Sequence, residues 1–280
     1  MTSKPKLYGL VGFPVKHSLS PCMHNAAFKA LKIKAKYKLF ELQVEQLEGF
    51  LNNLKKNNIA GFNVTIPYKE KVLPCLDIKA PGLREIGAVN TVVVAKDGKL
   101  KGFNTDFSGF RRHLKELNVS PRKAAIIGAG GAAKAVCFAL GKSNVEELCI
   151  YDIDVYKSLC LVSQLKDVFG QTKFAAVARI EELNLGGKDL LVNASPVGMR
   201  TLDPCLIDGT LLHKRLFVYD LIYNPTETKL LATAKKAGIR FSNGLGMLLY
   251  QGVICFEHFT GKKAPVEIMR TALEKGVKKL

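Results

Sequence analysis

The segment Ala124 to Ala133 constrains the fold most, because a short apolar run leads directly into a turn of small residues. It reads A-A-I-I-G-A-G-G-A-A. The apolar run predicts a short buried strand. The small residues that follow permit a tight turn, close approach to the backbone and close packing of the next helix on the strand. A strand, turn and helix of this kind predict an α/β fold with a parallel sheet.

Strand-like and helix-like patterns alternate along most of the chain, as expected for an α/β protein. The predicted strands cover 6–12, 36–42, 62–66, 89–95, 99–103, 124–128, 147–151, 189–193, 216–221 and 239–242. The predicted helices cover 21–31, 44–56, 106–117, 132–140, 156–169, 227–237, 245–259 and 265–278. The strands 89–95 and 99–103 flank K-D-G, which predicts an antiparallel hairpin in a mixed sheet.

The turn at 128–133 follows the pattern G-x-G-x-x-A, which is typical of dinucleotide-binding sites. The amide groups at the start of the next helix would face the pyrophosphate. A second predicted strand ends at Asp152, about 20 residues further on, where an acid that binds the adenosine ribose is expected. A carboxylate there accepts hydrogen bonds from ribose hydroxyls but repels a 2′-phosphate, so Asp152 favours NAD over NADP. Asp154 is interpreted as the cap of the following helix, and Lys157 is the one nearby cation.

These patterns together predict two domains. We expect a smaller α/β domain with a mixed sheet at 1–105 and a nucleotide-binding Rossmann domain at 106–243. The helical segment 244–280 has no place in a nucleotide-binding sheet, so we expect it to complete the first domain.

Composition narrows the class of protein. The formal charge is +18, with lysines gathered at 29–38. No helix-turn-helix, zinc-finger or interleaved aromatic pattern accompanies them, so we expect a solvated basic surface and no nucleic-acid partner. No apolar run could span a membrane and no signal peptide precedes the first strand, which favours a cytoplasmic protein. The seven cysteines and five histidines lack metal-binding spacing, so no metal is predicted.

Three segments of the first domain are unusually polar. Ser18 and Ser20 precede or begin a predicted helix, where a serine is a good cap but two hydroxyls could also hold a carboxylate. Lys69 follows a β-branched strand and a proline, and we expect it in the first turn of a helix. Asn90 and Asp106 flank the hairpin and are expected to lie close together, although Asp106 could simply cap the next helix.

The motifs S-L-S-P, N-V-T-I-P-Y-K, G-A-V-N-T, N-T-D, G-A-G-G-A-A, Y-N-P-x-E-T and G-L-G-M-L-L-x-Q occur in this order. With these motifs in this order, the chain resembles the shikimate dehydrogenases over nearly its whole length. The resemblance implies a substrate domain hinged to a Rossmann domain, with the active site in the cleft between them. It also implies reversible hydride transfer between shikimate or 3-dehydroshikimate and NAD(P)(H), in the aromatic amino acid pathway.

The resemblance assigns roles to individual residues. Lys69 and Asp106 would form the catalytic pair, a proton donor and acceptor at the hydroxyl that is oxidised. The implied substrate-binding residues are Ser18, Ser20, Thr65, Asn90, Tyr223 and Gln251. The implied cofactor-binding residues are Gly128, Ala129, Gly130, Gly131, Ala132, Asp152, Lys157, Asn193, Ser195, Met199, Gly244 and Met247.

Two features keep alternatives open. NADP-dependent members carry an N-R-T-type turn where this chain has D-I-D, which is more like the NAD-using quinate/shikimate dehydrogenases of quinate catabolism. Ser20, in contrast, is similar to the shikimate-preferring pattern. A non-catalytic dinucleotide-binding regulator is an alternative of another class, and it would be natural if Lys69 or Asp106 were missing. The partner expected is a small molecule, and the chain is compatible with a monomer or a homodimer.

Overall fold

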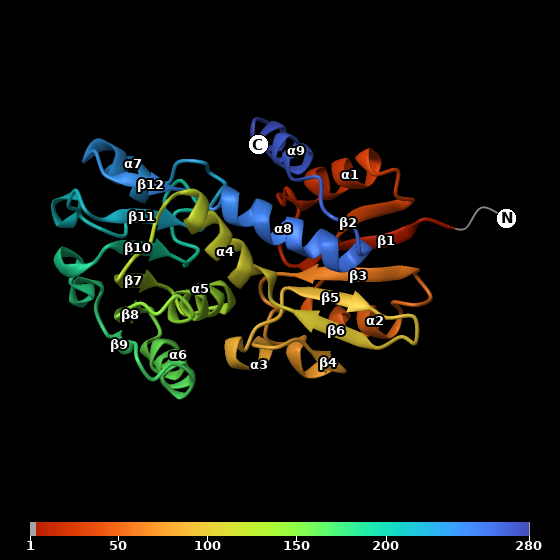
Figure 1. The fold of residues 1–280 in the computed structure, drawn as a ribbon, viewed down its shortest axis with the longest axis horizontal. Helices are drawn as coiled ribbons and strands as arrows, with labels where there is room; N and C mark the ends of the chain where they lie inside the picture. Colours follow the sequence, from red (N-terminus) through yellow and green to blue (C-terminus); the bar gives the residue numbers. More distant parts are fainter. Residues whose placement is uncertain (1–3, 280) are drawn as a thin grey trace. The chain divides into compact units, whose positions relative to one another are not determined.

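The computed structural model describes residues 4–279, which form two compact units (Figure 1). The first unit is Met1–Gly109 with Leu248–Leu280, and the second is Phe110–Met247. The chain passes between them twice, within helix α4 (Thr105–Glu116) and helix α8 (Leu245–Thr260). Each passage lies four residues beyond the domain limits expected from the sequence. None of the helices described is long and apolar enough to cross a membrane.

The α-helices are α1 Ser20–Ala30, α2 Leu47–Asn52, α3 Leu83–Ile86, α4 Thr105–Glu116, α5 Gly131–Gly141, α6 Val155–Val168, α7 Lys229–Lys236, α8 Leu245–Thr260 and α9 Val266–Val277. The short 3-10 helices are Val44–Gln46, Leu73–Cys75, Ile180–Leu183, Leu185–Gly187 and Gly209–Leu211.

The first unit is built on a mixed six-stranded sheet with the order β2-β1-β3-β5-β6-β4. Its strands are β1 Lys6–Gly12, β2 Ala35–Glu41, β3 Ile59–Val64, β4 Ile78–Lys79, β5 Thr91–Val94 and β6 Leu100–Phe103. Strands β1, β2 and β3 run parallel, whereas β5 pairs antiparallel with both β3 and β6. The predicted hairpin is therefore confirmed. Gly98 in its turn has φ +93°, a conformation that glycine adopts without strain.

The end of α8 packs directly on this sheet. The ring of Tyr8 in β1 stacks on Phe259 of α8 with 4.7 Å between ring centroids. The Tyr8 hydroxyl donates to the Phe259 carbonyl oxygen at 2.9 Å. A Cβ at Gly61 in β3 would lie 2.7 Å from the Phe259 ring, so glycine is what allows the helix to approach. Segments at opposite ends of the sequence therefore share one core.

The second unit is a parallel sheet with the order β12-β11-β10-β7-β8-β9. Its strands are β7 Lys123–Ile127, β8 Glu147–Tyr151, β9 Lys173–Val177, β10 Leu190–Asn193, β11 Phe217–Asp220 and β12 Arg240–Ser242. Parallel strands end at one edge, so the residues that follow β7, β8 and β10 gather there. The α/β fold with one mixed and one parallel sheet is the one expected from the sequence.

One predicted helix is too long, and the elements β4, α3 and β9 were not predicted. The helix expected over 44–56 is a 3-10 turn followed by the short α2, which ends at Asn52. Asn53 donates from its side chain to the Gly49 carbonyl oxygen at 2.8 Å, and Asn58 is left-handed with φ +54°. Asparagine competes with the helix for its own backbone groups, which stops the helix early. Strand β9 was not predicted, because its five residues show no clear alternation.

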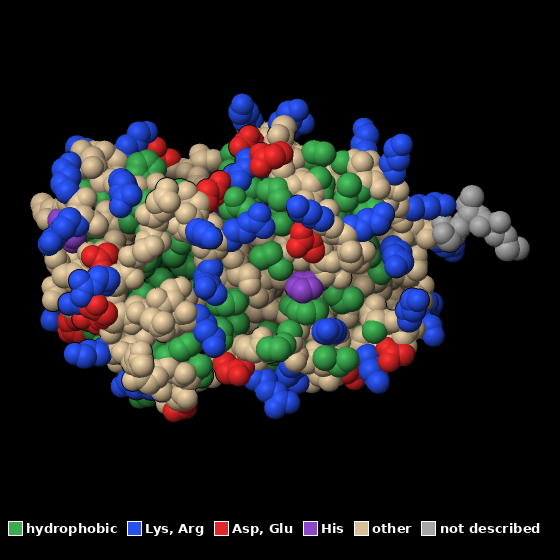
Figure 2. All heavy atoms as spheres, in the orientation of Figure 1, with side chains coloured by type: hydrophobic (Ala, Val, Ile, Leu, Met, Phe, Trp, Pro, Cys, Tyr) green, Lys and Arg blue, Asp and Glu red, His purple; other side chains and the backbone are tan. Residues whose placement is uncertain are grey.

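Lysine and arginine side chains are spread over the face seen in Figure 2 rather than gathered on one element. This is the distribution of a solvated basic surface. Among residues 4–279, no three His, Cys, Asp or Glu side chains form a group that could hold a metal ion.

His24 in α1 is a buried titratable group inside the first unit. It is 1% exposed and its ring stacks on Tyr37 at 4.4 Å between centroids. Neither ring nitrogen has a hydrogen-bond partner in the described part of the chain. Burial lowers the pKa of the imidazole to about 3. His24 is therefore neutral in the folded protein at ordinary pH.

This buried imidazole predicts a loss of stability in acid. The unfolded chain binds a proton at His24 below pH 6.5, whereas the folded chain does not until the pH approaches 3. Between pH 7 and pH 4.5 the free energy of unfolding should fall by about 2–3 kcal/mol more in the wild type than in His24→Phe. Urea denaturation followed by circular dichroism at each pH measures this. His17→Phe, at an exposed position, should keep the wild-type pH dependence. Equal slopes for the wild type and His24→Phe would contradict the prediction.

Candidate active site

Lys69 and Asp106 form a shielded ion pair in the first unit. The Lys69 Nζ donates to Asp106 Oδ2 at 2.5 Å, and the two side chains are 13% and 10% exposed. The pair is expected to be stronger than a surface ion pair, because little water screens it. It joins a proton donor and an acceptor that are 37 residues apart in the chain.

The backbone around Lys69 is fixed by a turn and not by the predicted helix. Residues 65–72 form turns after β3, and the next helical residue is Leu73. The Lys69 carbonyl oxygen accepts from the Val89 amide at 2.9 Å, while the Leu73 amide donates to Glu70 instead. The expectation of a helix at Lys69 was wrong, but the turn anchors the lysine to the start of the hairpin.

Asp106 does not cap α4. The Phe107 amide donates to Asn104 Oδ1 at 3.0 Å, so Asn104 is the cap and Asp106 lies inside the first turn. The Asn104 side chain also donates to the Ala88 carbonyl oxygen at 2.8 Å, which ties the helix start to the segment before β5. The Asp106 carboxylate is therefore available to pair with Lys69.

A buried polar network lies beside the pair. Asn90 Oδ1 accepts from the Thr105 amide at 2.7 Å, and Asn90 Nδ2 donates to Thr105 Oγ1 at 3.0 Å. Thr105 Oγ1 lies 3.4 Å from Gln251 Oε1 on α8. Asn90, Thr105 and Gln251 are 3%, 1% and 7% exposed. The structure therefore brings Asn90 and Gln251 together around Thr105, the residue next to Asp106.

Sequence reasoning missed the supporting members of this network. Thr91 Oγ1 donates to Asn90 Oδ1 at 3.1 Å, and Asn63 Nδ2 donates to Thr91 Oγ1 at 2.9 Å. Tyr37 donates in turn to Asn63 Oδ1 at 2.7 Å. Asn63, Thr91 and Thr105 stand inside the motifs N-V-T, V-N-T and N-T-D. The signal available in the sequence was the presence of polar residues in or next to segments expected to be buried.

Ser18 and Ser20 lie together at the start of α1. Ser18 Oγ donates to Ser20 Oγ at 3.3 Å and accepts from the Ser20 amide at 3.2 Å. The helix begins at Ser20 with Pro21 in its first turn, but the N-cap position is Leu19 and no side chain caps it. Capping therefore does not explain Ser20. Thr65 follows β3, and a Cβ at Gly12 would lie 2.3 Å from its methyl group, so β1 and Thr65 are in close contact.

In the second unit, the glycine-rich turn has the geometry that a dinucleotide requires. Gly128 has φ +107°, and a Cβ there would lie 2.9 Å from Ala194 backbone atoms. A Cβ at Gly130 would meet nothing within 4 Å, so this backbone borders open space. Helix α5 begins at Gly131 without a side-chain cap. Its first amide groups and the open space beside Gly130 fit a pyrophosphate.

Asp152 is bound to this turn. Its Oδ2 accepts from the Ala129 amide at 2.7 Å, and its Oδ1 accepts from the Asp154 amide at 2.9 Å. Asp154 caps α6 as predicted, accepting from the Tyr156 amide at 3.2 Å. Lys157 lies 3.6 Å from Asp154 Oδ2 in an exposed ion pair. The acid expected at the ribose therefore also holds the glycine-rich turn in place.

Asn193 and Ser195 organise the loop after β10. Ser195 Oγ donates to Asn193 Oδ1 at 2.7 Å, and Asn193 Nδ2 donates to Asp220 Oδ1 at 3.0 Å. Asp220 is fully buried, and this burial raises the pKa of its carboxyl group although Thr228, Ile222 and Asn193 donate to it. Sequence reasoning missed Asp220, which ends β11.

The remaining candidates lie in the second unit. Met199 is 54% exposed in the loop after β10, and Met247 in α8 is 7% exposed. A Cβ at Gly244 would lie 1.9 Å from the Leu221 carbonyl oxygen, so only glycine fits there. Tyr223 is half-buried and is followed by the cis Asn224–Pro225 bond.

Comparisons with known proteins agree with this arrangement. Residues 10–92 match the family model of the shikimate dehydrogenase substrate binding domain, and residues 244–274 match that of the shikimate 5'-dehydrogenase C-terminal domain. The chain is 44% identical to a protein of Methanopyrus kandleri named shikimate dehydrogenase (NADP(+)), over 97% of this chain and 96% of that one.

Solved structures agree over the whole length. A crystal structure of a shikimate dehydrogenase in complex with NADP+ superposes with a TM-score of 0.90 at 38% identity, covering 99% of this chain and 97% of that one. A quinate dehydrogenase from Corynebacterium glutamicum in complex with NAD superposes with a TM-score of 0.89 at 32% identity, covering 98% and 100%. The chain belongs to the shikimate dehydrogenase family of oxidoreductases.

Proposed function

We propose that this chain catalyses reversible hydride transfer between shikimate and a nicotinamide cofactor, and that it favours NAD. The observation that carries the proposal is the shielded Lys69–Asp106 pair beside the buried amides of Asn90 and Gln251. A small polyhydroxylated acid needs this combination, because each hydroxyl must find a partner when water is removed.

In this proposal the side chains of the first unit bind and orient the acid. The hydroxyls of Ser18 and Ser20 at the start of α1 hold its carboxylate. Thr65, Asn90 and Gln251 accept or donate at the ring hydroxyls. Asn90 and Gln251 can do so without reorganising, because the hydrogen bonds around Thr105 already fix them.

Lys69 and Asp106 handle the proton of the hydroxyl that reacts. Proton transfer by a positioned side chain lowers the barrier to forming or consuming the alkoxide. Asp106 keeps the lysine within hydrogen-bonding distance and places an opposite charge beside it. Because the two groups share one hydrogen bond, proton exchange with the substrate hydroxyl is assigned to the pair. When bound, the nicotinamide ring accepts or gives the hydride.

The NAD preference rests on the turn after β8. Asp152 and Asp154 place two carboxylates there, and Lys157 is already paired with Asp154. Ile153, between the two acids, is 93% exposed and offers no positive charge. A 2′-phosphate would meet repulsion from these two carboxylates, whereas ribose hydroxyls would find acceptors on Asp152. The relative from Methanopyrus kandleri carries NADP(+) in its name, so the preference rests on these residues alone.

A quinate-oxidising enzyme is the second candidate. Its support is the Asp-Ile-Asp turn together with the likeness to the quinate dehydrogenase that binds NAD. Ser20 favours shikimate, because it follows the pattern of shikimate-preferring members. The ratio of turnover on the two acids with NAD separates the two candidates.

Replacing Lys69 tests the catalytic role. Lys69→Gln should lower kcat for shikimate oxidation by roughly 10²–10⁴-fold, because a neutral amide cannot exchange the proton. The dissociation constant for NAD should stay within about twofold, because Lys69 lies outside the unit that holds the glycine-rich turn. Steady-state kinetics and calorimetric titration measure the two quantities. Lys71→Gln, an exposed lysine two residues away, is the matched control and should keep wild-type turnover. Near-normal turnover in Lys69→Gln would exclude the proposed role.

Changing the turn after β8 tests the cofactor preference. The double variant Ile153→Arg with Asp154→Asn should increase affinity for NADP by roughly 10–100-fold relative to NAD, since it adds a guanidinium and removes a carboxylate. Asp152 is kept because it holds the glycine-rich turn. Titration calorimetry with each cofactor gives the ratio. Leu159→Arg, which adds the same charge further along α6, should change it far less. An unchanged ratio in the double variant would show that this turn does not select the cofactor.

A further inference from the structure

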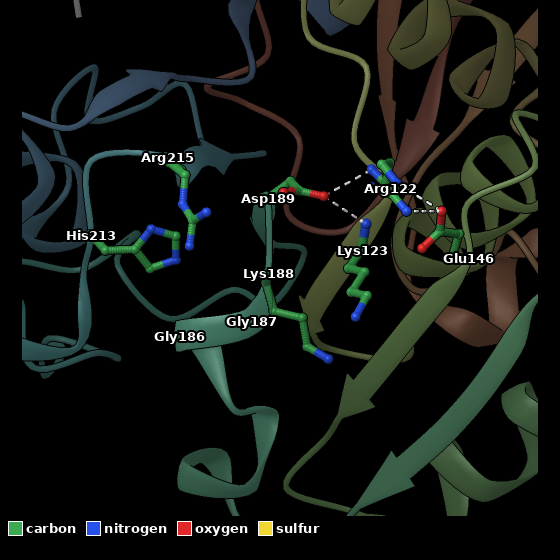
Figure 3. A pocket seen from close by; sticks show the side chains of 9 residues that line it. All are labelled: Arg122, Lys123, Glu146, Gly186, Gly187, Lys188, Asp189, His213 and Arg215. Carbon is green, nitrogen blue, oxygen red and sulfur yellow. Dashed lines mark hydrogen bonds and ion pairs between the residues drawn. The ribbon is translucent and has the colours of Figure 1, made fainter.

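The second unit has a pocket at the edge of its sheet opposite the glycine-rich turn (Figure 3). Lys123 begins β7 and Asp189 directly precedes β10, and both line a cavity of about 210 Å³. Strand β7 runs from this pocket to Gly128, so the two places are separated by roughly 16 Å of strand. The pocket shares no residue with the candidate active site.

The pocket carries an excess of positive charge. Arg122, Lys123, Lys188 and Arg215 line it, against the carboxylates of Glu146 and Asp189. Figure 3 shows Arg215 on one side and Lys123 with Lys188 across from it.

Both carboxylates of the pocket are already engaged. Asp189 Oδ2 accepts from the backbone amides of Arg122 and Lys123, each at 2.9 Å. Glu146 is paired with the Arg122 guanidinium at 2.6 Å.

The four cations differ in what they contact. Arg122 forms an ion pair with Glu146. The Lys188 side chain is 5% exposed and forms an ion pair with Glu147, which does not line the pocket. Lys123 and Arg215 form no ion pair within the part of the chain that the structure describes. Among the described residues, Lys123 and Arg215 therefore line the cavity outside any ion pair. Glu147, the cross-strand neighbour of Lys123, also interacts with it electrostatically, and the charge of Lys188 is paired with Glu147.

Two consecutive glycines line the pocket at positions where the fold itself does not require glycine. Neither Gly186 nor Gly187 has a left-handed φ, and a Cβ at either would meet nothing within 4 Å. Neither the turn nor the packing of the described residues therefore needs glycine. Bare backbone beside a cavity lets a ligand approach closely. His213 lies against this turn, with Nε2 at 3.0 Å from the Leu185 carbonyl oxygen.

We propose that this pocket binds a small multivalent oxyanion of the phosphate class, either inorganic phosphate or the phosphate group of a monoester. The guanidinium of Arg215 and the ammonium of Lys123 supply charge-assisted hydrogen bonds, and the Gly186–Gly187 backbone leaves room for the oxygen atoms. The proposal is independent of the dehydrogenase activity, because the site lies at the opposite end of β7 from the cofactor turn.

Calorimetric titration of the full chain with inorganic phosphate tests the proposal. NAD is present in excess so that phosphate cannot occupy the glycine-rich turn. The double variant Lys123→Gln with Arg215→Gln should bind phosphate at least about tenfold more weakly than the wild type. Lys166→Gln with Lys236→Gln removes the same charge from exposed positions of the second unit outside the pocket, and it should bind as the wild type does. Circular dichroism checks that both variants are folded.

Each outcome decides the proposal. Loss of binding only in the pocket variant supports it, and a parallel titration with glycerol 3-phosphate then identifies the source of the anion. Tighter binding of the ester indicates a monoester, and binding of phosphate alone indicates the free ion. Equal weakening of phosphate binding in both double variants would show that only the net charge of the protein matters, and it would overturn the proposed site. Absence of phosphate binding to the wild type, or binding that the pocket variant retains in full, would overturn the proposal.

Discussion

The Lys69–Asp106 ion pair is the interaction on which the site in the first unit depends. Its two side chains are about nine-tenths buried, and removing one partner of such a pair leaves an uncompensated charge that costs about 3–5 kcal/mol. The fold holds both ends in place with backbone hydrogen bonds. The Val89 amide fixes the lysine turn, and Asn104 caps α4 so that the carboxylate is available. The buried network around Thr105 connects this helix start to α8. The same network holds in place the side-chain amides that are proposed to bind the substrate.

The second unit reaches its binding geometry by a different route. There the backbone provides the contacts, and side chains mainly hold the backbone in position. Gly128 passes close to Ala194, Gly130 leaves open space, and Asp152 binds the Ala129 amide. Asp152 thus has a structural role in the turn, in addition to the ribose binding and cofactor choice proposed for it. Buried Asp220 supports the neighbouring loop in a similar way, through Asn193.

Much of this could be predicted from the sequence, because strong local patterns and the folded protein agree. The glycine-rich turn, the hairpin around Gly98 and the proximity of Asn90 to the start of α4 are examples. The errors arose where another hydrogen bond competes with the local pattern. Asn53 ended a helix that periodicity extended, and the Val89 amide took the Lys69 carbonyl oxygen that a helix would have used. Thr105, Asn63 and Asp220 were missed because their value depends on partners far away in the chain, which local spacing does not reveal.

We propose that the Lys69–Asp106 pair acts on shikimate with NAD. Initial rates of shikimate and quinate oxidation, each with NAD and with NADP, test it most directly. We expect the highest rate for shikimate with NAD, and the quinate rate places the enzyme within its family. Oxidation with NADP alone would contradict the role given to the Asp152 turn while leaving the ion pair intact. No oxidation of shikimate with either cofactor would contradict the proposed action of the Lys69–Asp106 pair on shikimate.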